Sequence, residues 1–561
     1  MNLVLASPAL ALAVSAAAAL PASAQLSPMA QGQGGYSVSA PLFTVGQTFT
    51  GTRGALNPLT AGDYTPPGVL DGLGAFALDA NTVRVLANHE LGAGAGYPYL
   101  VNDGQGGSFS LTGARVSYFD VDRTSRQIVD AGLAINKIYD ATGAVATDNS
   151  FLTAGFTGLS RLCSAQLVPA GSYGLVDTIF FTGEEDGGNF NPIGGAEWAL
   201  DVATGDLWQV PFMGRGAWEN ITPVAIGNPN LVAFILADDT SPFDADGDGI
   251  DEAAPLFAYV GVKNPAGGFL GRNGLKNGQL FVWVSSTGET SPLEFKGSGF
   301  LNGGFVPINN KPIPALASED GSTGFDEYGF PTQRNLWIQA EQVGAFGFSR
   351  PEDVATNPAD GTQIALASTG VDTYAVDPDT GDGVDTFGTV YVLDVNPTDG
   401  TGTLIIVYDG DADPKRTLRS PDNLDWADDG FIYAQEDKAE TDTLNGELLF
   451  GPGAVNTNEA GIVRLSTGSI ARRVANIDRN VVLDASLVDP IQAVDVDAGS
   501  VGAWESSGIL DVSSLFGEQP GHLFLIDIQA HGIDDQDQFN AGSRLTDNDL
   551  VEGGQLLFLE R

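Results

Sequence analysis

Acidic side chains and two histidines follow several short apolar runs of this 561-residue chain. Five runs end in this way: "TVRVLANHE" in Asn88-His89-Glu90, "TIFFTGEED" in Glu184-Glu185-Asp186, "LVAFILADD" in Asp238-Asp239, "FIYAQED" in Glu436-Asp437, and "HLFLIDIQAH" in Asp527, Gln529 and His531. One such ending means little, because turns after strands are polar. Clustered carboxylates, however, repel one another and resist ionisation unless a cation lies among them. Five similar endings favour one shared cation site.

The chain holds a single cysteine, Cys163, in the stretch "GFTGLSRLCSAQLVP". A lone cysteine excludes an internal disulfide and the paired-cysteine patterns of zinc and redox sites. Two interpretations remain. A free cysteine is usually a small buried hydrophobe, and the residues alone favour that interpretation. As a thiolate it would instead be a soft, strongly donating metal ligand.

Three further stretches carry residues suited to such a site. "GRGAWENITP" offers Glu219, and "RSPDNLDWADDG" offers Asp422. "GFSRPEDVATNPADGT" places Arg350 and Glu352 on either side of a proline. An arginine beside metal-binding acids presents a planar fork to an oxyanion. The alternative is that Arg350 only neutralises Glu352 in a turn.

The elements that must position these residues are β-strands. Short apolar or alternating runs such as "QLFVWVSS", "GTVYVLDV" and "TLIIVYDG" recur along the chain, separated by glycine, asparagine, aspartate and proline. The pattern predicts an all-β fold, a single β-propeller with long loop insertions, because a propeller accommodates many strands with short protected edges. Its innermost strands run along one axis, so their ends at one rim would converge.

Two segments look like insertions into this fold, an acidic one near 240–255 and a long irregular one near 301–335. The first carries Asp244, Asp246 and Asp248 at the spacing that begins a calcium loop. Pro255 stands where the bidentate glutamate of an EF-hand belongs, so the segment is not an EF-hand. A simpler calcium-stiffened loop and a plain acidic turn both remain open.

The overall charge limits the partners. With 25 Lys plus Arg against 71 Asp plus Glu, the formal charge is 25 − 71 = −46. This charge excludes a nucleic-acid-binding surface, which needs a basic face, and disfavours anionic membranes. The acid excess is explained either by a solvated surface or, for a minority of the groups, by cation binding.

The first residues suggest export. Residues 1–24 are apolar, rich in alanine and end in Ala22-Ser23-Ala24, which is typical of an export signal with its cleavage site. No later run of 18 apolar residues predicts a membrane span. We expect a secreted or periplasmic protein in which 25–561 form one domain that acts as a monomer.

Taken in order from about residue 84 to 531, these stretches resemble the PhoX family of secreted bacterial alkaline phosphatases. The resemblance lies in "NHE", the cysteine stretch, "TGEE", the Glu219 region, "ADD", "RPE", "PDNLDWADDG" and "QAH". It implies a six-bladed propeller whose channel holds a cluster of calcium and ferric iron. There, small-molecule phosphate monoesters would be hydrolysed. The family usually has histidine before the glutamate of its middle motif, where this chain has Trp218.

The resemblance also implies roles for individual residues. Cys163 matches a ligand of iron, and Arg350 matches the contact to the substrate phosphate. The carboxylates expected to bind metal are Glu90, Glu184 or its neighbour Glu185, Glu219, Asp238 or Asp239, Glu352 and Asp422. Two alternatives remain: a calcium-dependent propeller hydrolase of another class, phytase-like or lactonase-like, and a secreted calcium-binding propeller without catalysis.

Overall fold

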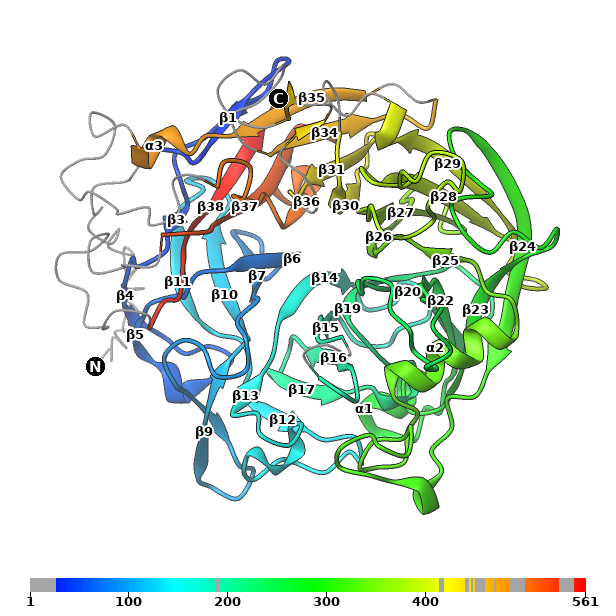
Figure 1. Cartoon of the computed structure of the whole chain (residues 1–561). Coiled ribbons are helices and arrows are strands. Elements are labelled where there is room, and N and C mark those ends of the chain that lie inside the picture. Colours follow the sequence, from blue (N-terminus) through cyan, green and yellow to red (C-terminus); the bar gives the residue numbers. More distant parts are fainter. Residues whose placement is uncertain are drawn as a thin grey trace, which may run out of the picture.

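Mostly antiparallel sheets surround a central axis in the computed structural model of the chain (Figure 1). The structure describes residues 27–187, 191–412, 418–438, 443–444, 447–449, 460–468, 471–483, 500–533 and 549–561. The predicted export signal, 1–24, lies outside this part. Within it, six sheets form blades, and their innermost strands contact one another in sequence until the sixth returns to the first. The predicted all-β fold and six-bladed propeller are confirmed.

In each blade the strands lie in the following order, from the axis outward. The first two blades are β6 (Leu70–Ala77), β7 (Thr82–His89), β10 (Arg115–Asp122) and β11 (Ile128–Leu133), then β14 (Leu162–Val168), β15 (Ile179–Glu184), β16 (Gly195–Asp201), β17 (Asp206–Gln209) and β12 (Lys137–Tyr139). The third and fourth are β19 (Trp218–Pro223), β20 (Leu231–Asp238), β22 (Phe257–Val262) and β23 (Gly278–Ser285), then β26 (Pro351–Thr356), β27 (Gln363–Ser368), β28 (Thr389–Val395) and β29 (Thr401–Asp409).

Strands from both ends of the chain complete the last two blades. The fifth is β30 (Pro421–Trp426), β31 (Ile432–Glu436), β34 (Gly461–Leu465), β35 (Ala471–Ile477) and β1 (Ala30–Gly32), and the sixth is β36 (Ile509–Asp511), β37 (Leu523–Ala530), β38 (Gly553–Glu560) and β2 (Ser37–Val38). The Met29 N–H also donates to Gln555 Oε1 at 2.7 Å. The ring is thus closed by β-pairing between N-terminal and C-terminal segments, which needs no disulfide.

Smaller elements decorate the blades. The remaining strands are β3 (Phe43–Thr44), β4 (Phe49–Thr52), β5 (Gly62–Tyr64), β8 (Tyr99–Asn102), β9 (Ser108–Gly113), β13 (Gly158–Leu159), β18 (Arg215–Gly216), β21 (Ala254–Pro255), β24 (Gly299–Ile308), β25 (Gly347–Phe348), β32 (Thr443–Leu444) and β33 (Glu447–Leu448). The described α-helices are α1 (Gly268–Arg272), α2 (Gln333–Gln342), α3 (Asn480–Leu483) and α4 (Ser513–Phe516). None of the described helices has the length and apolar character needed to cross a membrane.

Strand β24 corrects the first part of the irregular segment expected over 301–335, whereas 309–332 hold no α-helix or strand. Strand β24 pairs with β23 of the third blade and β29 of the fourth, joining the two blades into one nine-stranded sheet. The strand therefore covers two outer edges that would otherwise expose unpaired backbone groups. The end of the segment also begins helix α2, whose first turn is capped by Thr332.

The second strand of each blade is buried on both faces because neighbouring blades pack against each other. Seven of the eight residues of β7 and all eight of β37 are buried. Such strands read as nearly continuous apolar runs rather than alternating ones. A polar group inside them is consequently costly unless it is bonded or serves a site.

Candidate metal centre

A β-bulge follows the first residue of the innermost strand in five blades. In the first blade Leu70 pairs with His89 and Leu73 with Ala87, so β6 holds one extra residue. The same shift recurs in β14, β19, β26 and β30. A bulge re-aims a side chain, and here the second residue of every strand lines one cavity of about 190 Å³. We call these the bulge residues: Asp71, Cys163, Glu219, Glu352 and Asp422.

A second set of acids comes from the residue directly after the second strand of four blades. These strand-end acids, which line the same cavity, are Glu90, Glu185, Asp239 and Asp437. The backbone N–H of each donates to a carbonyl that precedes the bulge of its own blade, at 2.8 to 3.0 Å. The repeated bond fixes every strand-end acid beside the bulge residue of its blade. The convergence of strand ends expected from the sequence therefore occurs.

Glu184 and Asp238, which directly precede the strand-end acids Glu185 and Asp239 in the chain, lie outside the cavity. The Glu184 carboxylate accepts the backbone N–H groups of Ser160 and Ala196, at 3.1 and 3.2 Å. Asp238 accepts the N–H of Ala217 at 3.0 Å and the indole N–H of Trp337 at 2.8 Å. Successive side chains of a strand point to opposite faces, so only one residue of each pair reaches the axis.

The sequence left two choices open between adjacent acids, and in both pairs the second acid lines the cavity. Glu185 and Asp239 line the cavity, and Glu184 and Asp238 anchor the loops before the inner strands. The other residues expected to bind metal or substrate all line the cavity: Glu90, Cys163, Glu219, Arg350, Glu352 and Asp422. Of the remaining strand-end residues, Asn88, His89, Asp186, Glu436 and Asp527 do not line it.

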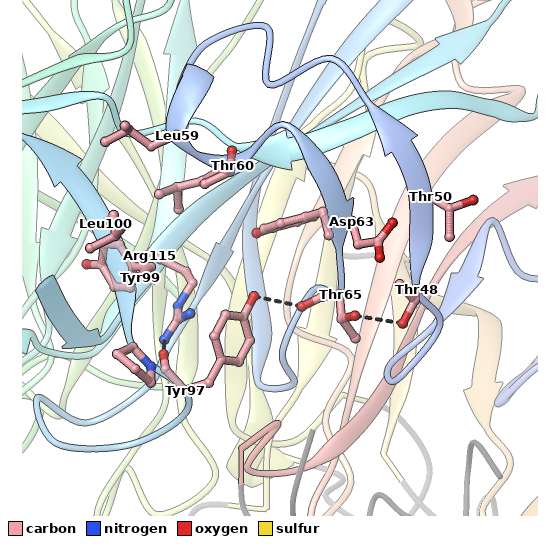
Figure 2. Close-up of a pocket in the computed structure, with 13 residues that line it drawn as sticks. Thr48, Thr50, Leu59, Thr60, Asp63, Thr65, Tyr97, Tyr99, Leu100 and Arg115 are labelled. Carbon is pink, nitrogen blue, oxygen red and sulfur yellow. Dashed lines mark hydrogen bonds between the residues drawn. The ribbon is translucent and has the colours of Figure 1, made fainter. Parts of the chain in front are cut away.

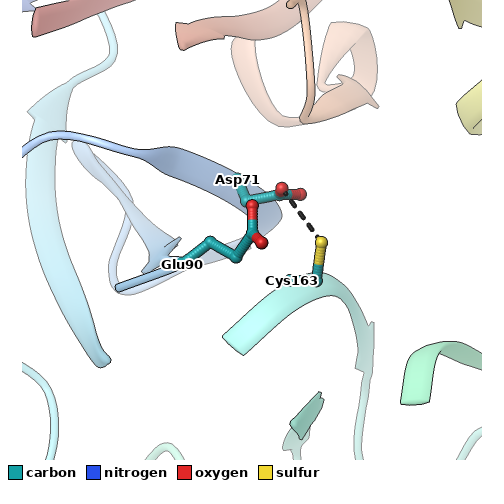
Figure 3. Close-up of side chains that lie close together, drawn as sticks. All are labelled: Asp71, Glu90 and Cys163. Atoms are coloured by element: carbon teal, nitrogen blue, oxygen red, sulfur yellow. Dashed lines mark hydrogen bonds between the residues drawn. The ribbon is translucent and has the colours of Figure 1, made fainter. Parts of the chain in front are cut away.

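The donors of this cavity form overlapping groups. The ligand atoms of Asp71, Glu90 and Cys163 lie within 4.8 Å of one another, and the Cys163 thiol donates to Asp71 Oδ2 at 3.3 Å (Figure 3). Two more groups satisfy the same limit: Cys163 with Glu185 and Glu219, and Glu219 with Glu352 and Asp422. Because the groups share Cys163 and Glu219, they run continuously across the channel.

Burial and mutual repulsion raise the pKa of several of these groups. Burial, followed by the nearby Glu352 and Asp71, raises the pKa of Glu219 well above its usual value. Burial, followed by the charge of Glu352, also raises the pKa of Asp422. Burial, followed by the charge of Asp71, raises the pKa of the Cys163 thiol. In addition, Glu219 Oε1 is buried without a hydrogen-bond partner among the described residues.

The donor set fits metal cations. Several carboxylates are hard ligands suited to calcium and ferric iron, and one thiolate is a soft ligand suited to iron. Cations would favour the ionised acids and satisfy the unbonded oxygen of Glu219. The carboxylates and the thiol that line the cavity therefore suit the calcium and iron that the resemblance implies.

Two arginines contact the acids of the cavity. Arg350 donates to both oxygens of Asp239, at 2.8 Å each, and its Nη2 lies 2.9 Å from Glu352 Oε1. Arg161 Nη2 lies 3.0 Å from Glu90 Oε1 and also contacts the carboxylate of Glu185. The sequence analysis identified Arg350 and missed Arg161, which stands two residues before the cysteine without an acid next to it in the chain.

Two acids of the cavity also escaped the sequence pattern. Asp71 begins a strand instead of ending one, so the pattern of acids after apolar runs cannot find it. Glu505 had a usable signal: "GAWES" at 502–506 repeats "GAWEN" at 216–220, which contains Glu219. Both tryptophans of the repeat are fully buried.

The two histidines at strand ends differ in their surroundings. His531 lines the cavity, with Nδ1 2.5 Å from Glu552 and Nε2 3.3 Å from Glu505. Although burial opposes its charge, these two carboxylates raise its pKa well above the usual value. His89 lies outside the cavity, its Nε2 2.6 Å from Ser117 Oγ, and burial lowers its pKa to about 3.

The acidic loop near 240–255 lies apart from this cavity. Carboxylate oxygens of Asp244, Asp246 and Asp248 lie within 4.8 Å of one another. Both oxygens of Asp244 accept backbone N–H groups of the loop itself, from Gly247 at 2.6 Å and Gly249 at 3.0 Å. The loop therefore has the bonding of an acidic turn, and a bound calcium ion stays an open alternative.

A larger cavity, of about 510 Å³, lies beside the first blade (Figure 2). Its wall includes Tyr97, whose hydroxyl donates to the Thr65 carbonyl, and the Thr48 and Thr65 hydroxyls bond to each other. The hydroxyl of Tyr99 likewise donates to a backbone carbonyl. The lining offers a single carboxylate, Asp63. Size alone therefore does not identify the site, and the smaller axial cavity holds the convergent ionisable groups.

Comparisons with known proteins agree with the fold. No protein-family model and no curated protein sequence matches the chain. Among solved structures, Pseudomonas fluorescens PhoX in complex with vanadate, a transition state analogue, is 14% identical; the match covers 96% of each chain with a TM-score of 0.56. Fructan 1-exohydrolase IIa from Cichorium intybus and an ancestral GH74 enzyme have TM-scores of only 0.20 and 0.16. The chain thus shares a propeller fold with PhoX.

Proposed function

We propose that the chain is a secreted or periplasmic metal-dependent phosphomonoesterase, an alkaline phosphatase similar to PhoX. One observation carries the proposal: five blades each deliver the second residue of a bulged inner strand to one cavity, and the only cysteine of the chain is among them. A buried hydrophobic cysteine would not need four carboxylates around it. The similarity in fold to PhoX, whose structure holds a transition state analogue, supports the same function.

The bulge residues and the strand-end acids would hold calcium and iron. Asp71, Glu90 and Cys163 form one group of donors, and Glu219 with Glu352 and Asp422 another. When bound, the cations supply positive potential and Lewis acidity that polarise a phosphoryl oxygen and lower the pKa of water. Without such cations, these acids would offer a phosphate dianion no attraction and, once ionised, would repel it.

The side chains of the chain then bind and orient the substrate. The Arg350 guanidinium, which contacts Asp239 and Glu352, would donate to equatorial oxygens of a phosphate ester and stabilise charge that develops there. A cavity of about 190 Å³ is large enough for a phosphoryl group, and a larger alcohol part would lie outside it. We therefore propose small-molecule phosphate esters as substrates.

The test uses the chain from residue 25 to 561. Its bound metals are measured by mass spectrometry, and hydrolysis of p-nitrophenyl phosphate is followed at alkaline pH with and without a chelator. We expect calcium and iron in the isolated protein and activity that the chelator abolishes. A sample that holds both metals and releases no phosphate would refute the proposal.

A further inference from the structure

One arginine of the cavity, Arg161, has no role in the function proposed above. We infer that Arg161 binds the anionic group of the substrate together with Arg350, as a second guanidinium of the same site. The inference rests on the proposed function, because it takes a tetrahedral oxyanion as the ligand. It is tested by anion binding, which is measured separately from hydrolysis.

The two arginines hold the same place in two blades. Each lies two residues before the bulge residue of its blade, and each has a left-handed backbone, with φ of 45° for Arg161 and 60° for Arg350. The carbonyl of each accepts the N–H of the residue that follows the second strand, from Glu185 at 2.8 Å and from Thr369 at 2.9 Å. Blades two and four therefore present their guanidinium groups from matching positions to one cavity.

Each arginine is held in part by an acid from the preceding blade. Arg161 reaches Glu90, which follows the second strand of blade one, as Arg350 reaches Asp239, which follows that of blade three. Arg161 also contacts Glu185 of its own blade. Charge-assisted pairs of this kind orient a planar guanidinium, which carries five N–H donors. The acids thus position both forks at the seams between blades.

The equivalent position in three other blades holds no cation. It is Val69 in the first blade, Ala217 in the third and Ser420 in the fifth. In the fifth blade this position is Ser420, although Asp422 and Asp437 of that blade both line the cavity; the arginine whose charge reaches Asp437 is Arg350 of the fourth blade. Neutralising the acids of a blade therefore does not by itself require an arginine at this position. Its presence in blades two and four points to a ligand with negative charge.

The ligand chemistry that fits two planar forks is a tetrahedral oxyanion. Phosphate and vanadate have several oxygens that accept paired N–H donors, and arginine matches this geometry where lysine offers only a point charge. We assign Arg161 to positioning these oxygens, alongside Arg350. The assignment predicts that lysine at either position weakens oxyanion binding although the charge is kept.

The experiment measures binding of inorganic phosphate and of orthovanadate to protein that holds its metals, by titration calorimetry. Arg161→Lys should weaken both anions ~10-fold or more, while metal content and thermal midpoint stay close to wild type. Arg350→Lys should act in the same direction. Arg215→Lys is the matched control, because Arg215 forms a buried pair with Asp326 away from the cavity, and it should bind both anions as wild type does.

Each alternative result overturns the inference. Unchanged affinity in Arg161→Lys would exclude Arg161 from anion binding. A loss of affinity that follows a loss of metal would make Arg161 only a support for Glu90 and Glu185. Should the lysine variant not fold, Arg161→Gln is read by the same criteria. Wild-type protein that holds its metals and binds neither anion would refute the proposed function itself, whereas wild-type binding with no effect at Arg161 refutes only this inference.

Discussion

The Cys163 sulfur lies 3.3 Å from Asp71 Oδ2, across the seam between the first and second blades. The two residues are 92 positions apart in the chain and occupy the same place on β6 and β14. Burial first, and then the charges of Glu90 and Asp527, raise the pKa of Asp71. Burial, followed by the charge of Asp71, raises the pKa of Cys163. A cation that binds between them would replace the shared proton, which makes this pair the most informative place to test the site.

Replacing the thiol tests for iron. Cys163→Ser keeps the size of the side chain but removes the soft ligand, so we expect the iron content to fall while calcium remains. The value of kcat/KM for p-nitrophenyl phosphate should fall ~10-fold or more, in line with the usual effect of changes at a metal site. Metal analysis and kinetics on the same sample check this. Full activity without iron would favour the calcium-dependent hydrolase of another class.

Substitutions at the adjacent Glu184 and Glu185 distinguish a residue that supports the fold from one that lines the cavity. Glu184→Gln replaces a carboxylate that accepts two backbone N–H groups, so we expect a loss of about 1–3 kcal/mol in the free energy of unfolding with metal content unchanged. Glu185→Gln removes a candidate metal ligand and one contact of Arg161, which keeps its contact to Glu90, so stability should change less than in Glu184→Gln while metal content and activity fall. Urea denaturation and metal analysis of both variants check the contrast. A Glu184 variant that loses metal at full stability would contradict it.

Stability of the metal-free protein should depend on pH in an unusual direction. Burial, together with Glu505, raises the pKa of Asp437 to about 8, and the acids of the bulge residues are raised as well. At a pH above about 4 these groups ionise in the unfolded chain but keep their protons in the fold. The unfolded state then binds fewer protons, so stability falls as pH rises from about 4 to 8.

Calorimetry in chelator at pH 5, 6.5 and 8 measures this dependence. We expect the midpoint of thermal unfolding to fall over the series, and excess calcium to restore it most at pH 8, where the ligands lose their protons most easily. Asp422→Asn should flatten the decline, because asparagine does not titrate. A midpoint that rises with pH in chelator would show that the acids of the cavity are already ionised in the metal-free fold.

The sequence predicted the propeller and most of the site, but not its detail. Acids after apolar runs located Glu185 and Asp239, since strand ends converge in a propeller whatever the register. The pattern could not separate Glu185 from Glu184, because the choice depends on which face of β15 meets the axis. Asp71 escaped it for a related reason: its position depends on a bulge, which arises from the pairing of two strands rather than from local residue types.

Gly72 is the residue through which the bulge of the first blade can be tested. It directly follows Asp71, and a Cβ built on it would lie 2.4 Å from backbone atoms of Ser164 and Ala165 in β14. Backbone at that distance cannot move aside cheaply, so Gly72→Ala should separate β6 from β14. We expect a loss of about 1–3 kcal/mol in the free energy of unfolding, as for other overpacked sites.

The same substitution should also displace Asp71 from Cys163, because the added methyl group acts at the seam that brings them together. Affinity for metal and kcat/KM should therefore fall in Gly72→Ala, and added calcium should recover only part of the stability. Gly92→Ala is the control: Gly92 lies two residues after Glu90, near the same cavity, and a Cβ there meets nothing within 4 Å. If both variants keep wild-type metal content and activity, the bulge does not determine where Asp71 lies, and the five repeated bulges would be a feature of the blades rather than of the site.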